Sequence, residues 1–294
     1  MNKNRQGHMF YTAAMIPLII ATAVLFVYPV IVAFTQSFTN ASFAAPDATR
    51  FVGFHNYVRF FTDPIGRQVL GNTLKFAFTV VLGETVLGLL VALLLNKSFP
   101  GKGVVRTIMI IPAMLSPVLV GYMWRWIYHD QFGILNFILL QLGLIQVPIA
   151  WTGNISVAMP ALLAAQIWYG VPFAIIIFMG GLDMLPATPY EAAIVDGASS
   201  LQSFWHITLP LLKPVTMAVV LLRSMFAFQA FDLIFILTYG GPGSATEVMN
   251  SYGYKIAFRH FQTGYASAIT MVSLILLLAL GIVVNLVFNG GKSK

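Results

Sequence analysis

Residues 188–212 read TPYEAAIVDGASSLQSFWHITLPLL, a polar, glycine-containing segment between two long apolar runs. Pro189 suits the first turn of a helix. The Thr188 hydroxyl and the Glu191 carboxylate have the spacing of a capping box, in which each side chain accepts a hydrogen bond from the other residue's backbone N–H. Gly197 can adopt the left-handed conformation that ends a helix. The segment therefore predicts a short helix that starts at the threonine and stops before the glycine.

A second short helix is expected after the glycine. Ser199 or Ser200 can cap its first turn, and the helix continues over residues 201–206. Pro210 marks a change of direction, because proline lacks the backbone N–H that a continuing helix needs. The whole segment is therefore predicted to form two short helices joined by a glycine turn.

The first of these two helices is expected to have one face made of small side chains. Ala192 and Ala193 would allow another helix or a groove to approach its backbone closely, while Tyr190 and Ile194 would offer apolar contacts at helical spacing. These features suit a segment that another protein binds. They suit equally a helical hairpin at the membrane surface that only connects two spans.

The flanking sequence is that of a membrane protein. Hydrophobic residues make up 59% of the 294 residues and charged residues 9%, whereas about a quarter of the residues of a soluble domain are charged. A helix of ~20 apolar residues crosses the ~30 Å hydrocarbon core of a bilayer, and six runs are long enough. We expect an all-α membrane protein with six transmembrane helices and with the polar loop between spans four and five. The spans are expected at residues 11–37, 70–96, 104–126, 155–181, 214–237 and 266–288.

The distribution of positive charge predicts the orientation. The first run follows Lys3 and Arg5 but is too long for the apolar part of a signal peptide, so we interpret it as a span. An even number of spans puts both termini on one side, and that side carries more lysine and arginine per residue, which predicts that both termini are cytoplasmic. The net charge of +7 is scattered over many loops, which argues against a nucleic acid partner. The residues assigned to the cytoplasmic side are Lys3, Arg5, Lys97, Lys102, Arg106, Lys213, Lys292 and Lys294.

The domain organisation is expected to be simple. No internal repeat and no low-complexity tract interrupts the six runs. We therefore predict a single transmembrane domain over residues 1–294, with a core over about residues 66–288 and the polar loop over about residues 182–213.

Several stretches carry a family resemblance. The order Glu191-Ala192-Ala193, three residues, Gly197, nine residues, Ile207, one residue, Leu209-Pro210 resembles the EAA loop of permease subunits of bacterial binding-protein-dependent ABC importers. The LTYGGP sequence at residues 237–242 is similar to that of the first of the two permease subunits that such systems usually encode. The stretches that resemble the carbohydrate-uptake branch of the family are FVGFHNY at 51–57, LLNKSFPGKGVVRTIMIIP at 94–112, FDLIFILTYGGPGSAT at 231–246 and YGYKIAFRHFQTGYASA at 252–268.

The resemblance implies a non-catalytic, multi-pass subunit in the bacterial inner membrane. In that family the EAA loop forms short cytoplasmic helices that dock in a groove of the ATP-hydrolysing subunit. The implied partners are a second permease subunit, two ATP-binding subunits, an extracytoplasmic solute-binding protein and membrane lipid. The chain itself is expected to bind no cofactor, metal or nucleic acid, since the partner ATPase subunits would use ATP and Mg²⁺. The implied docking residues are Glu191, Ala192, Ala193, Gly197, Ile207, Leu209 and Pro210.

The same resemblance favours a sugar as the transported substrate, with glycerol 3-phosphate or a related polyol phosphate as the alternative. A different class, an ion-coupled secondary transporter, would be expected to carry buried charged relays in repeated halves. An enzyme is not indicated, because neither HExxH nor GxSxG occurs and the five histidines are dispersed. The tail GGKS at residues 290–293 does not complete a phosphate-binding loop, because Leu286 stands where its first glycine is needed.

Polar side chains at membrane depth indicate the transport path, because they usually face a bundle interior or a cavity. In the fourth span, Gln166 lies near Trp168 and Tyr169, a combination of amide and aromatic faces that suits the hydroxyls and C–H face of a sugar. In the fifth span, Gln229 and Asp232 are three residues apart and would share a helix face. The alternative for each residue is a structural role. Glu84 and Arg223 are weaker candidates, for which an interhelical hydrogen bond or an ion pair is the alternative.

Overall fold

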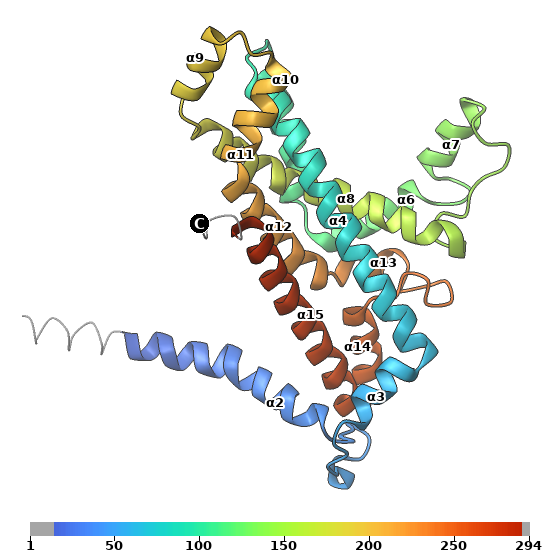
Figure 1. Ribbon diagram of the computed structural model, residues 1–294. Helices are drawn as coiled ribbons and strands as arrows, with labels where there is room; N and C mark the ends of the chain where they lie inside the picture. The colour runs from blue at the N-terminus through green and yellow to red at the C-terminus, as the bar shows by residue number, and fades with distance from the viewer. Residues whose placement is uncertain (1–14, 290–294) are drawn as a thin grey trace, which may run out of the picture. The chain divides into compact units, whose positions relative to one another are not determined.

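The computed structural model describes residues 15–289 (Figure 1), and within them the regular structure is helical apart from one isolated bridge between Thr39 and Phe51. Lys3, Arg5, residues 11–14 of the first predicted span and the tail 290–293 lie outside the described residues. The chain divides into two compact units. Unit 1 runs to Gly66 and includes Gly253–Val272, and unit 2 comprises Arg67–Tyr252 and the chain from Ser273 onward. The single domain expected over residues 1–294 stays a prediction.

Unit 1 contains the first span. Residues 15–22 are helical and continue through a π-helical turn, η1 (Ala23–Val27), into α2 (Tyr28–Ser37). None of the most apolar window of Met15–Ser37 is buried within the structure, as expected for a helix whose surroundings are lipid or another chain. A loop with a short 3₁₀ turn, η2 (Pro46–Ala48), then leads to α3 (His55–Thr62).

Helix α3 is fastened to the end of α2 by its polar residues. The buried Asn56 amide donates hydrogen bonds to the carbonyl oxygens of Ser37, at 2.9 Å, and Thr39, at 2.8 Å. The Tyr57 and Ser37 hydroxyls are 2.6 Å apart. The last carbonyls of a helix have no partner within it, so Asn56 satisfies part of the end of α2 and fixes where α3 begins.

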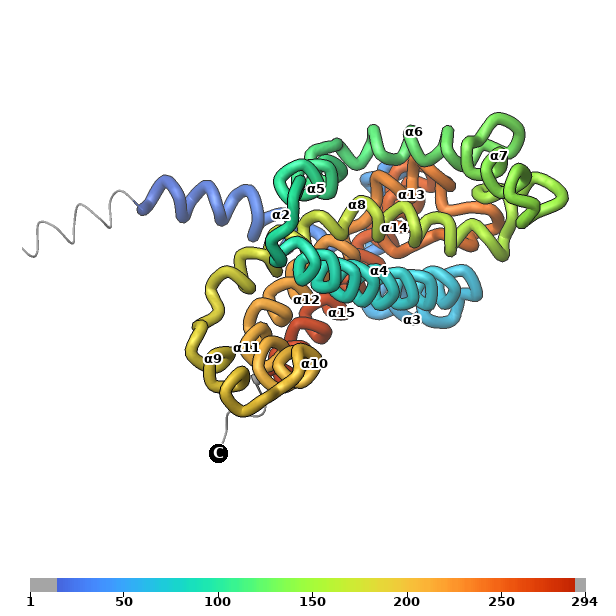
Figure 2. Tube along the Cα trace, turned by 90° about the horizontal axis from the view of Figure 1, so that it is seen from above, coloured from blue at the N-terminus to red at the C-terminus, as the bar shows by residue number. Residues whose placement is uncertain are grey.

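Three long helices of the structure confirm three predicted spans. They are α4 (Pro64–Asn96), α8 (Ile155–Asp183) and α15 (Thr263–Asn289). In the view of Figure 2, α8 runs between α4 and α6 (Pro117–Ile127). More than half of the most apolar window of α8 is buried, in keeping with its hydrophobic residues on all sides. The remaining helices of unit 2 are α5 (Lys102–Ile110), η3 (Ile111–Met114), α7 (Ile134–Gln141), α9 (Thr188–Val195), α10 (Ser200–Ser203), η4 (Phe204–Thr208), α11 (Leu209–Leu211), α12 (Lys213–Phe228), α13 (Asp232–Leu237) and α14 (Met249–Phe258), which continues into unit 1.

The core of unit 2 has two parts. One joins α4, α8 and α13 through fully buried side chains such as Phe76, Leu162 and Ile234. The other joins α4, α8 and the start of α12 around Phe178 and Leu212. Helix α8 contributes to both parts, so it positions the polar residues that it carries.

The third predicted span is not a straight helix. Lys102–Met114 and Pro117–Ile127 form an angle of 103°, so the expectation of a continuous helix over residues 104–126 is wrong. Pro117 explains the break, because it lacks an N–H and disfavours helical geometry in the residue before it, Ser116, which is extended. The Ser116 hydroxyl caps α6 by accepting a hydrogen bond from the Leu119 N–H at 3.2 Å.

The fifth predicted span is also interrupted. Helix α12 ends at Phe228 and α13 begins at Asp232, so a continuous helix over residues 214–237 is wrong. Neither proline nor glycine lies at this break. Its cause is tertiary packing: α13 packs along α6, and a chain that leaves α12 must change direction to do so.

Candidate functional site

The polar segment forms the expected pair of short helices, at the end of unit 2 where α4 finishes (Figure 1). Its first capping prediction is wrong. The N-cap of α9 is Ala187, which already has helical backbone angles, so Thr188 lies inside the helix and makes no capping hydrogen bond. Glu191 remains in the first turn, where its negative charge suits the positive end of the helix dipole.

The glycine turn is confirmed. Gly197 has a φ of +73°, its N–H donates to the Ile194 carbonyl at 3.1 Å, and the Ala198 N–H donates to the Ala193 carbonyl at 2.9 Å. This pair of bonds is the Schellman motif. The capping box of the segment occurs one helix later, where Ser199 accepts from the Gln202 N–H at 3.3 Å and the Gln202 side chain accepts from the Ser199 N–H at 2.8 Å.

The two arms of the hairpin are joined by a hydrogen bond. The hydroxyls of Tyr190 in α9 and Thr208 in η4 are 2.9 Å apart, so Tyr190, which is half-buried, holds the hairpin together. The chain bends by 63° between Leu211 and Lys213, directly after Pro210.

The docking residues that the resemblance implies differ in exposure. Glu191, Ala192, Gly197 and Pro210 are exposed, Ala193 is buried, and Ile207 and Leu209 are half-buried. Large apolar side chains add to the exposed surface of the hairpin, although the docking pattern does not contain them. They are Ile194, at 76% exposed, Val195, at 87%, Leu201, at 67%, and Trp205, at 57%.

A cavity of about 320 Å³ lies between α8, α12 and α13. It brings together four of the five residues proposed from the sequence for the transport path: Gln166, Tyr169, Gln229 and Asp232. Trp168 does not line this cavity and packs edge-on against Trp124 of α6, with ring centroids 5.7 Å apart. The other lining residues are Ala113, Pro117, Phe173, Arg223, Phe226, Ala230, Phe231 and Leu233.

Some cavity residues lie on the continuous helix α8, and others lie at the break between α12 and α13. Gln229 is the C-cap of α12 and Asp232 is the first residue of α13, so the two do not share a helix face as predicted. They face the same cavity because the chain breaks between them. The Tyr169 hydroxyl donates a hydrogen bond to the Leu115 carbonyl at 3.3 Å, at the break in the third span.

Sequence reasoning missed the aromatic lining. Phe173 lies seven residues after Gln166, and Phe226 lies three residues after Arg223, so each shares a helix face with a polar residue at membrane depth. This spacing was the available signal for both rings.

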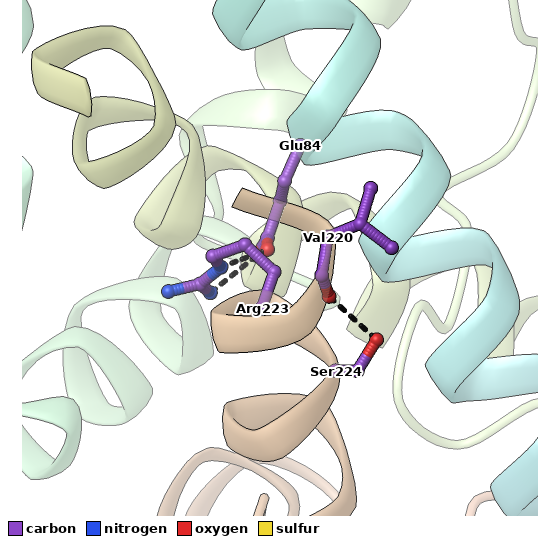
Figure 3. A network of polar contacts seen from close by, with 4 residues as sticks. All are labelled: Glu84, Val220, Arg223 and Ser224. Carbon is purple, nitrogen blue, oxygen red and sulfur yellow. Dashed lines mark hydrogen bonds and ion pairs between the residues drawn. The ribbon is translucent and has the colours of Figure 1, made fainter. Parts of the chain in front are cut away.

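Glu84 and Arg223 form a buried ion pair between α4 and α12 (Figure 3). The guanidinium contacts the carboxylate through two nitrogens: Nε with Oε2, and Nη2 with Oε1 at 2.8 Å. The Glu84 side chain is fully buried and that of Arg223 is 7% exposed. The structure therefore favours the structural alternative for both residues, because bidentate geometry is the strongest form of such a pair.

Helix α8 and a further residue of α12 complete the surroundings of the ion pair. Gly170 of α8 packs against it, and a methyl group on this residue would overlap both the carboxylate and the guanidinium. The guanidinium carbon also lies 5.5 Å from the ring centroid of Phe173 and 5.2 Å from that of Phe226. Arg223 thus reaches the cavity with its charge already paired and with two aromatic rings near its guanidinium.

The charge of the cavity follows from these contacts. Asp232 is exposed at the cavity and makes no ion pair within the part of the chain that the structure describes. With Arg223 neutralised by Glu84, the charged lining carries one negative charge in excess. The site therefore offers amide and carboxylate hydrogen-bonding groups, aromatic faces and no unpaired cation.

Long apolar helices, two of the predicted spans interrupted, and a cavity that holds amide and carboxylate groups define a helical protein with several candidate membrane spans. The chain belongs to the family of binding-protein-dependent transport system inner membrane components, whose sequence model matches residues 84–289. The resemblance drawn from the EAA pattern is thereby confirmed at the level of the family.

Individual proteins extend this similarity to nearly the whole chain. The chain is 35% identical over 284 residues, 96% of its length and 94% of the relative's, to the trehalose/maltose transport system permease protein MalF of Thermococcus litoralis. It is 34% identical over 273 residues, 93% of its length and 91% of the relative's, to the multiple sugar-binding transport system permease protein MsmF of Streptococcus mutans. Among solved structures, a chain of a bacterial ABC transporter involved in the import of the acidic polysaccharide alginate has the same fold, with a TM-score of 0.84, 22% identity and 99% of each chain covered.

Proposed function

We propose that this chain is a permease subunit of an ATP-driven sugar importer and that the cavity between α8, α12 and α13 is part of the sugar's path. The observation that carries the proposal is the meeting of Gln166 and Gln229 with the rings of Tyr169 and Phe173 in one cavity. Amide groups exchange hydrogen bonds with sugar hydroxyls, and aromatic faces pack against the C–H face of the ring. The trehalose/maltose and multiple-sugar systems of the two relatives support the same substrate class.

The charges around the cavity favour a sugar over a polyol phosphate. A phosphate would need an unpaired cation or several free N–H donors, whereas Arg223 is already paired with Glu84. Asp232 at the cavity would repel a phosphate. An ion-coupled carrier is disfavoured by the same pairing. The buried charges beside the cavity, Arg223 and Glu84, bind each other, so neither is free to bind a coupling ion or to pass on a proton.

The hairpin is proposed to dock to a separate ATP-hydrolysing subunit. Ile194, Val195, Leu201 and Trp205 support this role, because exposed apolar side chains of this size are typical of a surface that a partner covers. In this proposal six spans cross the membrane, each bent pair counting as one, and both termini and the hairpin are cytoplasmic. The remaining partners are a second permease subunit, a second ATPase copy and an extracytoplasmic solute-binding protein.

Co-purification tests the proposed assembly. A tagged chain solubilised from its native membrane is expected to bring down a second permease and an ATPase. The Glu191→Lys variant is expected to lose the ATPase alone, because the substitution reverses a charge on the exposed side of α9. Asp130→Lys, the same charge change in an exposed loop outside the hairpin, serves as the control. An unchanged set of partners in Glu191→Lys would count against docking through this hairpin.

Substitutions in the cavity test the path. Gln229→Ala and Asp232→Asn are each expected to weaken the apparent affinity for the sugar by about 2–10-fold, the effect of one lost hydrogen bond, while assembly stays intact. Uptake into proteoliposomes that contain the whole complex is the measurement, with Tyr122→Phe at an exposed site of α6 as the control. If either cavity variant fails to assemble, its residue has a structural role instead.

A further inference from the structure

Helix α3 carries an apolar face that the described residues of unit 1 leave exposed. Phe54 at its N-cap, Val58 and Phe61 are 69%, 58% and 49% exposed. Their spacing of four and three residues places them on one face of a helix. We call these three residues the α3 apolar face.

The other two sides of α3 have different partners. Asn56 and Phe60 are buried, and His55, Arg59 and Thr62 form an exposed polar side. On that polar side the Arg59 guanidinium donates to the Gln262 side chain at 2.8 Å and lies 4.1 Å from the ring centroid of Tyr265. Helix α3 is therefore strongly amphipathic and presents polar and apolar sides to its surroundings at the same time.

A chain of aromatic rings connects the α3 apolar face to the first span. Phe34 of α2 contacts Phe38, with centroids 5.2 Å apart, and Phe38 contacts Phe54 at 5.3 Å and Phe51 at 6.4 Å. Phe34, Phe51 and Phe54 are all exposed, at 54%, 79% and 69%. The exposed apolar surface of the span thus continues onto α3 without a polar gap between the rings.

The position of this face relative to the span is fixed. Asn56 and Tyr57 bond to Ser37 and Thr39 at the C-terminal end of α2, so α3 cannot leave the level at which the span ends. That level is the interface between hydrocarbon and water, where aromatic side chains are enriched in membrane proteins.

We propose that α3 is an interfacial helix whose apolar face, together with Phe51, lies in the headgroup region of the leaflet at which the first span ends. Amphipathic helices with bulky apolar residues on one side lie in that plane. We favour lipid over a protein partner as the cover of this face. The face continues the apolar surface of Met15–Ser37, which is long enough to cross a membrane, and an exposed polar side lies directly beside it. This inference does not depend on the transported substrate.

The absence of cysteine from the sequence permits a direct test. Val58→Cys and Phe61→Cys each place one label on the α3 apolar face. Phe61→Cys removes a ring that contacts Phe60, whereas Val58→Cys removes no aromatic ring. His55→Cys is the matched control on the polar side of the same helix, and Asp47→Cys marks an exposed loop. Each variant of the complete transporter is labelled with an environment-sensitive fluorophore and reconstituted into phosphatidylethanolamine and phosphatidylglycerol vesicles, where quenching by headgroup-level nitroxide lipid is compared with quenching by aqueous iodide.

Labels at positions 58 and 61 are expected to be quenched several-fold more by the nitroxide lipid than by iodide, and labels at 55 and 47 the reverse. Iodide quenching at 58 and 61 equal to that at 47 would overturn the proposal, since the face would then be in water. Protection of 58 and 61 from both quenchers would also overturn it and would identify a protein partner as the cover.

Discussion

A Glu84→Gln variant is expected to lose about 3–5 kcal/mol of unfolding free energy, because Arg223 would keep its charge in a buried place without its carboxylate partner. Few other changes in unit 2 are expected to cost as much, since this pair joins α4 to α12 and α8 packs against it through Gly170. Thermal and denaturant unfolding of the purified protein in bicelles measures the loss.

A double variant, Glu84→Gln with Arg223→Gln, separates the charge from the packing. It removes both charges and leaves two amides that can bond to each other, so it is expected to recover most of the stability that the single variant loses. A single variant as stable as the native protein would show that water in the cavity already solvates Arg223. A double variant less stable than the single one would show that the unpaired charge is not the cause of the loss.

A Gly197→Val variant is expected to insert into the membrane normally and to lose most transport. Gly197 has a φ of +73°, where a residue with a side chain costs about 1–2 kcal/mol, which lowers the equilibrium constant for forming the correct hairpin about 5–30-fold. Apart from the two chain neighbours, no described residue has an atom within 4 Å of the position of an added Cβ, so the effect is one of backbone conformation and not of collision.

Gly197→Asn is the matched control, because asparagine tolerates the left-handed conformation better than other residues with side chains. The measurement is uptake together with substrate-stimulated ATP hydrolysis, each normalised to the amount of permease in the membrane. Uptake by the valine variant at the native rate would contradict a role of the hairpin in coupling, whereas loss in both variants would indicate that the position itself is covered by a partner.

The sequence predicted the long helices well for a physical reason. Uninterrupted apolar runs such as those of α4, α8 and α15 have one stable backbone arrangement in lipid, the helix. The breaks at Leu115–Ser116 and Gln229–Phe231 were missed, because apolar composition is the same for a straight helix and for a bent one. The prolines near the first break were a usable signal, but the second depends on α13 packing against α6, which no local pattern encodes.

The helix ends and the cavity residues were likewise only partly predictable from the sequence. The glycine turn was predictable because few residues other than glycine adopt its backbone angles. Thr188 was chemically able to cap the first helix, but Ala187 already has helical backbone angles, so the helix starts one residue earlier than the side-chain chemistry suggests. In the cavity, Gln166 stood out as an amide in an apolar run. Phe173 and Phe226 did not, since aromatic rings in such runs usually face lipid or core.

The bend in the third span bears on the order in which this protein is made. Its two arms, Lys102–Met114 and Pro117–Ile127, are about 20 Å and about 17 Å long, so neither alone crosses a bilayer core of ~30 Å. In the finished protein the Leu115 carbonyl at the bend is satisfied by the hydroxyl of Tyr169, which the ribosome adds more than fifty residues later. We therefore expect the segment to enter the membrane as one straight helix and to bend only after α8 has been inserted beside it.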